Sequence, residues 1–192
     1  MQNIALRVAT PPEWAEVALS DFDAFLLDHG SCERKASAVG MSFVVRYPDR
    51  KAILDPMIQF AREELEHFHQ VYRLIAARHL TLWPDQEDPY VNRLMKSVRF
   101  GREERFLDRL LVSALIEARG HERLGLVTEH LKDPELQQFY QRLTRAEARH
   151  RDLFLELAHP YFPDETILKR LNDLCDAEAE AIQATPFRPA LH

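Results

Sequence analysis

Four glutamates and two histidines are placed in this sequence where metal-binding side chains could meet. In each of four long amphipathic stretches, apolar residues recur at alternating steps of three and four, and a glutamate interrupts the middle of the apolar column. Burying four carboxylates is costly, because each loses its hydration and all repel one another, and divalent cations remove both costs. The six residues are Glu33, Glu64, His67, Glu117, Glu147 and His150.

Two of these stretches carry a Glu-x-x-His pair, Glu64 with His67 and Glu147 with His150. Residues three apart lie on the same face of a helix, so one turn can offer an oxygen and a nitrogen to one ion. A single Glu from each of two helices and a Glu-x-x-His pair from each of two others form the ligand set of ferritin-like di-iron bundles. The sequence therefore predicts two iron ions held by these six side chains.

The Glu-x-x-His spacing occurs two further times, so it does not identify ligands alone. At about 100° per residue, Glu66 lies roughly 200° around its helix from Glu64. Glu156 lies about 180° from Glu147 by the same count. We interpret both additional pairs as exposed: Glu66 with His69, and Glu156 with His159. For the six ligand candidates the alternative is a buried salt-bridge network, but no apolar column contains Arg or Lys.

Two more histidines lie one helical turn from candidate ligands. His29 precedes Glu33 by four residues, and His121 follows Glu117 by four. Such neighbours can orient a metal ligand through a hydrogen bond. The alternative for each is an ordinary hydrogen-bonded histidine of the core or its boundary.

The elements that must position these residues are helices, and the expected fold class is all-α: a ferritin-like four-helix bundle with short extra helices at the N- and C-termini. Ser20 with Asp23 resembles a capping pair, and Asp133-Pro134 is a strong helix start. One domain over 1–192 is expected, with its core bundle over about 20–158. The expected helices are a short one near Pro12, four long ones over about 20–47, 50–77, 102–131 and 134–158, a short piece over 90–98 and a C-terminal helix over about 165–184, followed by a mobile tail, 186–192.

The four long stretches form an internal repeat. Glu33 and Glu117 are 84 positions apart, and Glu64 and Glu147 are 83 apart. The repeat predicts two similar helical hairpins, each contributing half of the ligands.

Composition supports this fold and limits the function. The chain of 192 residues has only 5 glycines, 46% hydrophobic residues and 29% charged residues, which suits long amphipathic helices. A net charge of −6 argues against a general nucleic-acid coat protein. Cys32 and Cys175 form neither a disulfide framework nor a Cys-x-x-Cys site. With no signal peptide or membrane span recognisable, we expect a cytoplasmic protein.

The sequence also resembles the MiaE-type tRNA hydroxylases over nearly its whole length. The strings that carry the resemblance are Leu27–Ala36, Gln59–Phe68, Ala114–Arg119 and Glu147–His150. The resemblance implies a non-haem di-iron monooxygenase that uses dioxygen to hydroxylate the isopentenyl group of 2-methylthio-isopentenyl-adenosine in tRNA. It also implies an external electron donor, a reductase or a ferredoxin-type protein, and we expect a monomer or small homo-oligomer.

A tRNA substrate should leave a basic surface, and arginines recur at helical spacing in two places. Acidic residues lie among them, so the alternative is a salt-bridged surface exposed to solvent. The candidates for tRNA binding are Arg99, Arg102, Arg105 and Arg109 in one stretch and Arg142, Arg145 and Arg149 in the other.

Three rival functions remain open at the level of sequence. A ferritin-like ferroxidase without an organic substrate would use the same six ligands. A rubrerythrin-like peroxidase is disfavoured because the electron-transfer cysteines are absent. A metal-free helical interaction protein would bind no iron.

Overall fold

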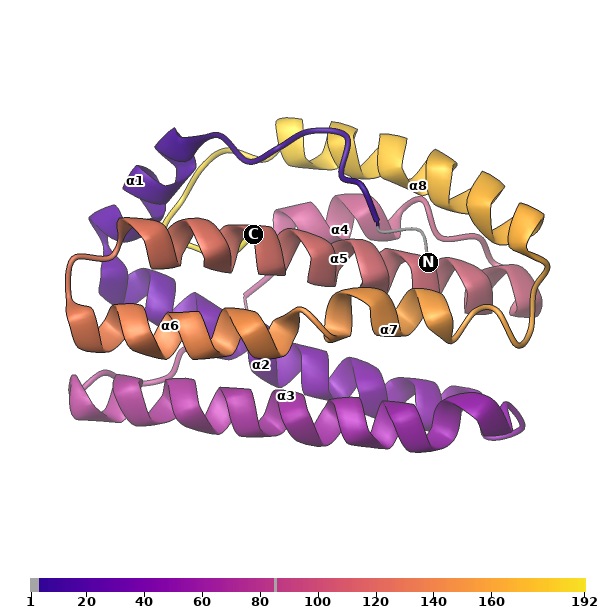
Figure 1. Cartoon of the computed structure of the whole chain (residues 1–192), viewed down its shortest axis with the longest axis horizontal. Helices are drawn as coiled ribbons and strands as arrows, with labels where there is room; N and C mark the ends of the chain where they lie inside the picture. The colour runs from indigo at the N-terminus through magenta and orange to yellow at the C-terminus, as the bar shows by residue number, and fades with distance from the viewer. Residues whose placement is uncertain (1–3, 85) are drawn as a thin grey trace. The chain divides into compact units, whose positions relative to one another are not determined.

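The computed structural model describes residues 4–84 and 86–192, and every regular element in these ranges is helical (Figure 1). The all-α prediction is therefore confirmed. The helices are α1 (Pro12–Ser20), α2 (Phe22–Arg46), α3 (Lys51–Ala77), α4 (Pro89–Met95), α5 (Arg102–His130), α6 (Pro134–Glu147), α7 (His150–Glu156) and α8 (Asp164–Gln183).

Aspartates cap the starts of three helices: Asp21 for α2, Asp88 for α4 and Asp133 for α6. The side chain of Asp133 accepts hydrogen bonds from the backbone N–H groups of Glu135 and Leu136, as the Asp-Pro signal predicts. Ser20 does not cap α2. Its hydroxyl instead donates to the carbonyl of Val17 at the end of α1, and Asp21 accepts from the N–H of Ala24 at 3.0 Å.

The helices fall into two compact units. The first, called here the α5–α8 unit, comprises residues up to 16, residues 87–187 and residue 192; the second, the α2–α3 unit, comprises residues 17–86 and 188–191. The boundary passes through α1. A single domain over 1–192 stays a prediction.

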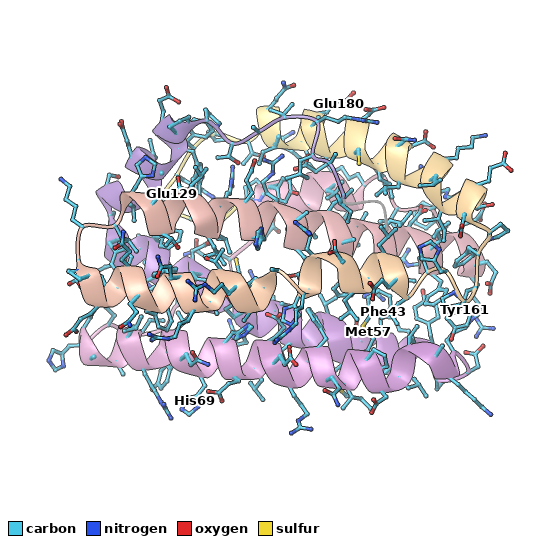
Figure 2. The ribbon with its side chains drawn as sticks, viewed as in Figure 1. Phe43, Met57, His69, Glu129, Tyr161 and Glu180 are labelled. Carbon is cyan, nitrogen blue, oxygen red and sulfur yellow. The ribbon has the colours of Figure 1, made fainter. Side chains whose placement is uncertain are left out.

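In the α2–α3 unit two long helices pack closely, and Gly40 explains how. A Cβ atom at Gly40 would lie 2.9 Å from Cδ1 of Phe60 and 3.0 Å from the carbonyl oxygen of Met57. The missing side chain thus lets α2 approach α3. Phe43 and Met57, labelled in Figure 2, are fully buried.

In the α5–α8 unit α5 is central and packs against α4, α6, α7 and α8. A buried polar network crosses its packing. The guanidinium of Arg119 donates to both carboxylate oxygens of Glu178 on α8, at 2.9 and 3.1 Å, and to the hydroxyl of Thr10 at 3.0 Å. The phenol of Tyr90 on α4 donates to the same Glu178 at 3.1 Å. One arginine therefore connects α5 to α8 and to the N-terminal segment, and through Glu178 to α4.

The helix expected over 134–158 is interrupted, which corrects the sequence prediction. α6 ends at Glu147 and α7 begins at His150. The N–H of Arg149 bonds the carbonyl of Ala146, a tightened step of three residues, and the hydroxyl of Thr144 donates back to the carbonyl of Tyr140. Both features locally disturb an α-helix.

The tail 186–192 packs against the protein, so the expectation that it is mobile was wrong. Leu191 is 4% exposed, and its N–H donates to the carboxylate of Asp28 at 2.8 Å. His192, within the α5–α8 unit, lies 3.2 Å from the carboxylate of Asp88 and stacks on Tyr90.

Candidate metal centre

Three predicted ligands and one predicted neighbour come together in the α2–α3 unit. Glu33 and His29 lie on α2, and Glu64 and His67 lie on α3. All four are buried, with exposures of 0% to 7%. Nε2 of His29 lies 2.6 Å from a carboxylate oxygen of Glu33, so one turn of α2 fixes the orientation of that carboxylate.

The spacing around His67 suits a shared ion. Its Nδ1 atom lies 3.8 Å from Oε2 of Glu33 and 4.0 Å from Oε1 of Glu64. These distances exceed a hydrogen bond. Two donors that bind one ion at about 2.1 Å each can be up to about 4.2 Å apart. Buried oxygen and nitrogen donors at these separations fit a divalent transition metal.

The α5–α8 unit supplies the other predicted pair. Glu147, the last residue of α6, is 5% exposed and His150, the first of α7, is 2% exposed. Nδ1 of His150 lies 2.9 Å from Oε2 of Glu147. Glu117 lies on α5 and is half-buried.

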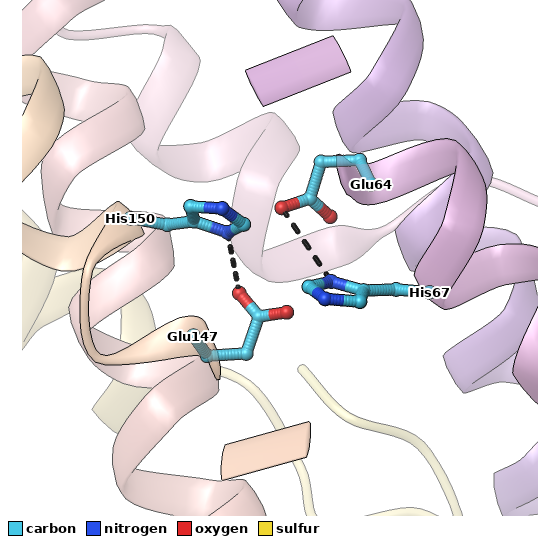
Figure 3. Close-up of side chains that lie close together, drawn as sticks. All are labelled: Glu64, His67, Glu147 and His150. Atoms are coloured by element: carbon cyan, nitrogen blue, oxygen red, sulfur yellow. Dashed lines mark hydrogen bonds and ion pairs between the residues drawn. The ribbon is translucent and has the colours of Figure 1, made fainter. Parts of the chain in front are cut away.

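Figure 3 draws the two Glu-x-x-His pairs, with the contact inside each pair as a dashed line. The pair on α3 belongs to one uninterrupted helix. The pair of Glu147 and His150 instead flanks the break between α6 and α7. The same four-residue motif therefore positions its two donors through two different backbones.

The two additional Glu-x-x-His pairs are exposed, as their helical phase predicts. The side chains of Glu66 and His69 are 59% and 52% exposed. His159 is 48% exposed and contacts Asp164. Helical phase thus separated the buried pairs from the exposed ones.

His121, the other predicted neighbour, is half-buried on α5. Burial lowers its pKa, and the guanidinium of Arg151 lowers the pKa further. A neutral imidazole is favoured as a result. Its environment differs from that of fully buried His29.

The candidate tRNA-binding arginines differ in their surroundings. Arg99 binds the buried carboxylate of Asp108 with two guanidinium nitrogens, at 2.9 and 2.7 Å. Arg170 on α8 binds Asp108 as well. Burial alone would raise the pKa of Asp108, but hydrogen bonds from both arginines outweigh it and lower that pKa. Arg99 therefore serves the packing of the α5 N-terminus.

The remaining arginines lie nearer the surface. Arg105 and Arg109 are half-buried. The exposed ones are Arg102, Arg142, Arg145 and Arg149.

Sequence reasoning missed the buried network around Arg119. Tyr90 belongs to it, and burial, followed by the nearby charge of Glu178, raises the pKa of Tyr90 well above its usual value. The signal available was weak, because Arg119 and Glu178 are 59 positions apart.

An open cavity of about 700 Å³ lies along the outer face of α3, the face that carries the exposed pair Glu66 and His69. Its lining mixes apolar and polar side chains, and Leu65 within it is 55% exposed. The lining residues are Gln59, Arg62, Glu63, Leu65, Glu66, Phe68 and His69.

Comparison with known proteins gives consistent relatives. A family model described as tRNA-(MS[2]IO[6]A)-hydroxylase (MiaE) matches residues 1–192. A Pseudomonas putida protein named tRNA 2-(methylsulfanyl)-N(6)-isopentenyladenosine(37) hydroxylase is 38% identical over 179 residues, 93% of this chain and 87% of the relative. A Salmonella typhimurium protein of the same name is 34% identical over 135 residues, 70% of this chain and 49% of that protein.

A solved structure has the same fold. It is titled "Protein 43 with aldehyde deformylating oxygenase activity from Synechococcus" and superposes with a TM-score of 0.92 at 39% identity, covering 97% of this chain and 94% of that one. Over the ranges that the structure describes, no helix has the length and apolar character needed to cross a membrane.

Proposed function

Because this chain belongs to the MiaE family, we propose that it is a dioxygen-dependent monooxygenase that hydroxylates the isopentenyl group of 2-methylthio-isopentenyl-adenosine in tRNA. One oxygen atom of dioxygen enters a C–H bond of that group, and the other leaves as water. Besides dioxygen, this reaction consumes two electrons and two protons. The chain has no flavin or nicotinamide motif, so a reductase or ferredoxin-type partner in the cytoplasm delivers the electrons.

The six buried or half-buried donors are the proposed ligands of two iron ions: Glu33, Glu64, His67, Glu117, Glu147 and His150. When bound, reduced iron supplies the activation of dioxygen. The side chains have their own tasks. His29 holds the carboxylate of Glu33 in one orientation, and the Glu147–His150 contact does the same for the second pair.

Within each unit we expect buried apolar side chains to keep water from the ligands of that unit. Phe60 on α3 is 2% exposed, while Phe106 on α5 and Phe154 on α7 are fully buried. Leu110 and Leu143 are 0% and 3% exposed. A dry environment strengthens the interactions of the carboxylates and limits quenching by water.

The observation that carries the proposal is the pair of buried Glu-x-x-His motifs within a chain matched end to end by the family model. The match to a family of hydroxylases favours an organic substrate over a ferroxidase.

The Synechococcus structure supports a second candidate function. Its title names aldehyde deformylating oxygenase activity, and its fold matches nearly all of this chain. An aldehyde is a smaller substrate that needs no RNA-binding surface. The two candidates therefore differ in the substrate.

Mass analysis of tRNA nucleosides tests the proposal. Iron-loaded protein, a chemical reductant and air are incubated with tRNA that contains the isopentenyl nucleoside. We expect a gain of one oxygen atom with the wild type, loss of that gain with Glu147→Ala, and full activity with Glu66→Ala, whose exposed pair is the matched control. Unmodified tRNA together with formate released from an aliphatic aldehyde would favour the second candidate instead.

A further inference from the structure

The outer face of α6 carries a row of positive charge. Arg142 and Arg145 follow the uncharged Gln138 at steps of four and three, and all three side chains are exposed. At about 100° per residue they lie within about 60° of each other around the helix. Arg149, directly before α7, follows Arg145 by four residues in the sequence and is also exposed. We call Arg142, Arg145 and Arg149 the α6 arginine row.

On α6 itself, few acidic residues accompany Arg142 and Arg145. The acidic residues of α6 are Glu135 in its first turn and Glu147, which is buried. Glu135 is separated from Arg142 by seven residues, roughly 10 Å along the helix axis. Within the described ranges no carboxylate forms an ion pair with Arg142 or Arg145.

The other set of candidate arginines is different. Arg99 is bound to buried Asp108, and Arg102 is followed directly by the exposed Glu103 and Glu104. These carboxylates reduce the positive potential at the start of α5. The surroundings therefore distinguish two sets that look alike in the sequence.

We propose that the α6 arginine row binds the phosphate backbone of an RNA substrate, an inference that rests on the proposed function. Guanidinium groups form paired, charge-assisted hydrogen bonds with phosphate oxygens. Side chains one helical turn apart lie about 5–6 Å from one another, so neighbouring arginines can contact separate phosphates. The partner that this surface fits is a single polyanionic strand.

The row lies on the face of α6 opposite its buried side. Tyr140, Leu143 and Glu147 are buried, and Arg145 is two residues, about 200°, from Glu147. Phosphate contacts at this face position the RNA and do not recognise the modified base. Removing them should weaken binding without altering the chemical step.

The test compares two double variants of the iron-loaded full chain. Arg142→Gln with Arg145→Gln removes two charges from the row, and Arg102→Gln with Arg105→Gln is the control of equal charge change at α5. Binding of substrate tRNA is measured over a series of salt concentrations. For the α6 variant we expect roughly fivefold to tenfold weaker binding and a salt dependence reduced by about two phosphate contacts. For the α5 variant we expect the affinity for tRNA and its salt dependence each to change by less than about twofold.

Steady-state kinetics supply a second measurement. With the α6 variant we expect KM for tRNA to rise while kcat and the iron content stay at wild-type values. Equal effects of both double variants on the salt dependence, or no effect of the α6 variant, would overturn the inference. Failure of the proposed function would look different: tRNA would bind through α6 with the expected salt dependence but would gain no oxygen.

Discussion

The two units solve one task, the placement of a Glu-x-x-His pair, with different internal structures. In the α2–α3 unit both helices are uninterrupted, and histidine and glutamate contact one another across and along them. In the α5–α8 unit the pair flanks a helix break, and the Arg119 network connects α5 to α8 and, through Glu178, to α4. The comparison teaches that a repeated ligand pattern does not require a repeated scaffold.

The histidines next to the proposed ligands also differ between the two units. His29 contacts Glu33. The equivalent position in the second half of the repeat, 84 residues later, is Ser113, which has no imidazole ring. His121 lies on the other side of Glu117 in the sequence and is only half-buried. The predicted internal repeat therefore extends to the ligands and not to their supports.

Stability should separate the units most strongly. Arg119→Ala would leave Glu178 buried without its partner, so we expect the free energy of unfolding to fall by about 3–5 kcal/mol. Arg78→Ala removes an ion pair with Asp23 whose side chains are 42% and 44% exposed, and it should cost less than about 1 kcal/mol. Urea unfolding measures both. Similar losses for the two variants would mean that the α5–α8 unit does not depend on its network.

Iron affinity should separate the two histidines. His29→Ala removes the contact that orients Glu33, and we expect iron affinity to fall about 10–100-fold. His29→Gln keeps a hydrogen-bond donor and should recover part of the loss. His121→Ala is the comparison in the other unit, with a smaller expected effect. Competition with a chelator measures the iron affinity of all three variants. A larger loss of affinity for His121→Ala than for His29→Ala would contradict the assignment of His29 as the histidine that orients a ligand.

Glycine substitutions should give the smallest effects, with opposite signs. Gly40→Ala places a methyl group against Phe60 and Met57, so we expect a loss of about 1–2 kcal/mol. Gly125→Ala meets nothing within 4 Å and should gain up to about 1 kcal/mol from helix propensity. Thermal unfolding is sufficient to measure the signs. Stabilisation by both would show that α2 and α3 do not need their close approach.

The sequence predicted most of the helices because their signals are local. Asp133-Pro134 and the apolar columns correctly placed the start of α6 and the buried faces. The break after Glu147 was missed, since Ala148 and Arg149 are good helix formers and only Thr144 gave a weak local signal. Nor could spacing show that Arg99 is bound to Asp108 together with Arg170, a residue 62 positions further on.

The site was predictable to a similar extent. The buried pairs and the contact of His29 follow from three- and four-residue spacings on single helices. The role of all six ligands stays a proposal, as do the arginines that bind tRNA. The α3 cavity had no signal in the sequence, because an exposed Leu65 cannot be distinguished from a core leucine by type.

The central claim is the proposal that Glu33, Glu64, His67, Glu117, Glu147 and His150 are the ligands of two iron ions. Mössbauer spectroscopy of protein loaded with iron-57, combined with an iron count per chain, tests it most directly. We expect two iron ions per chain in one magnetically coupled pair, with the coupling lost in both Glu64→Ala and Glu147→Ala and kept in Glu66→Ala. One isolated ion per chain, or coupling that survives either ligand substitution, would contradict the claim.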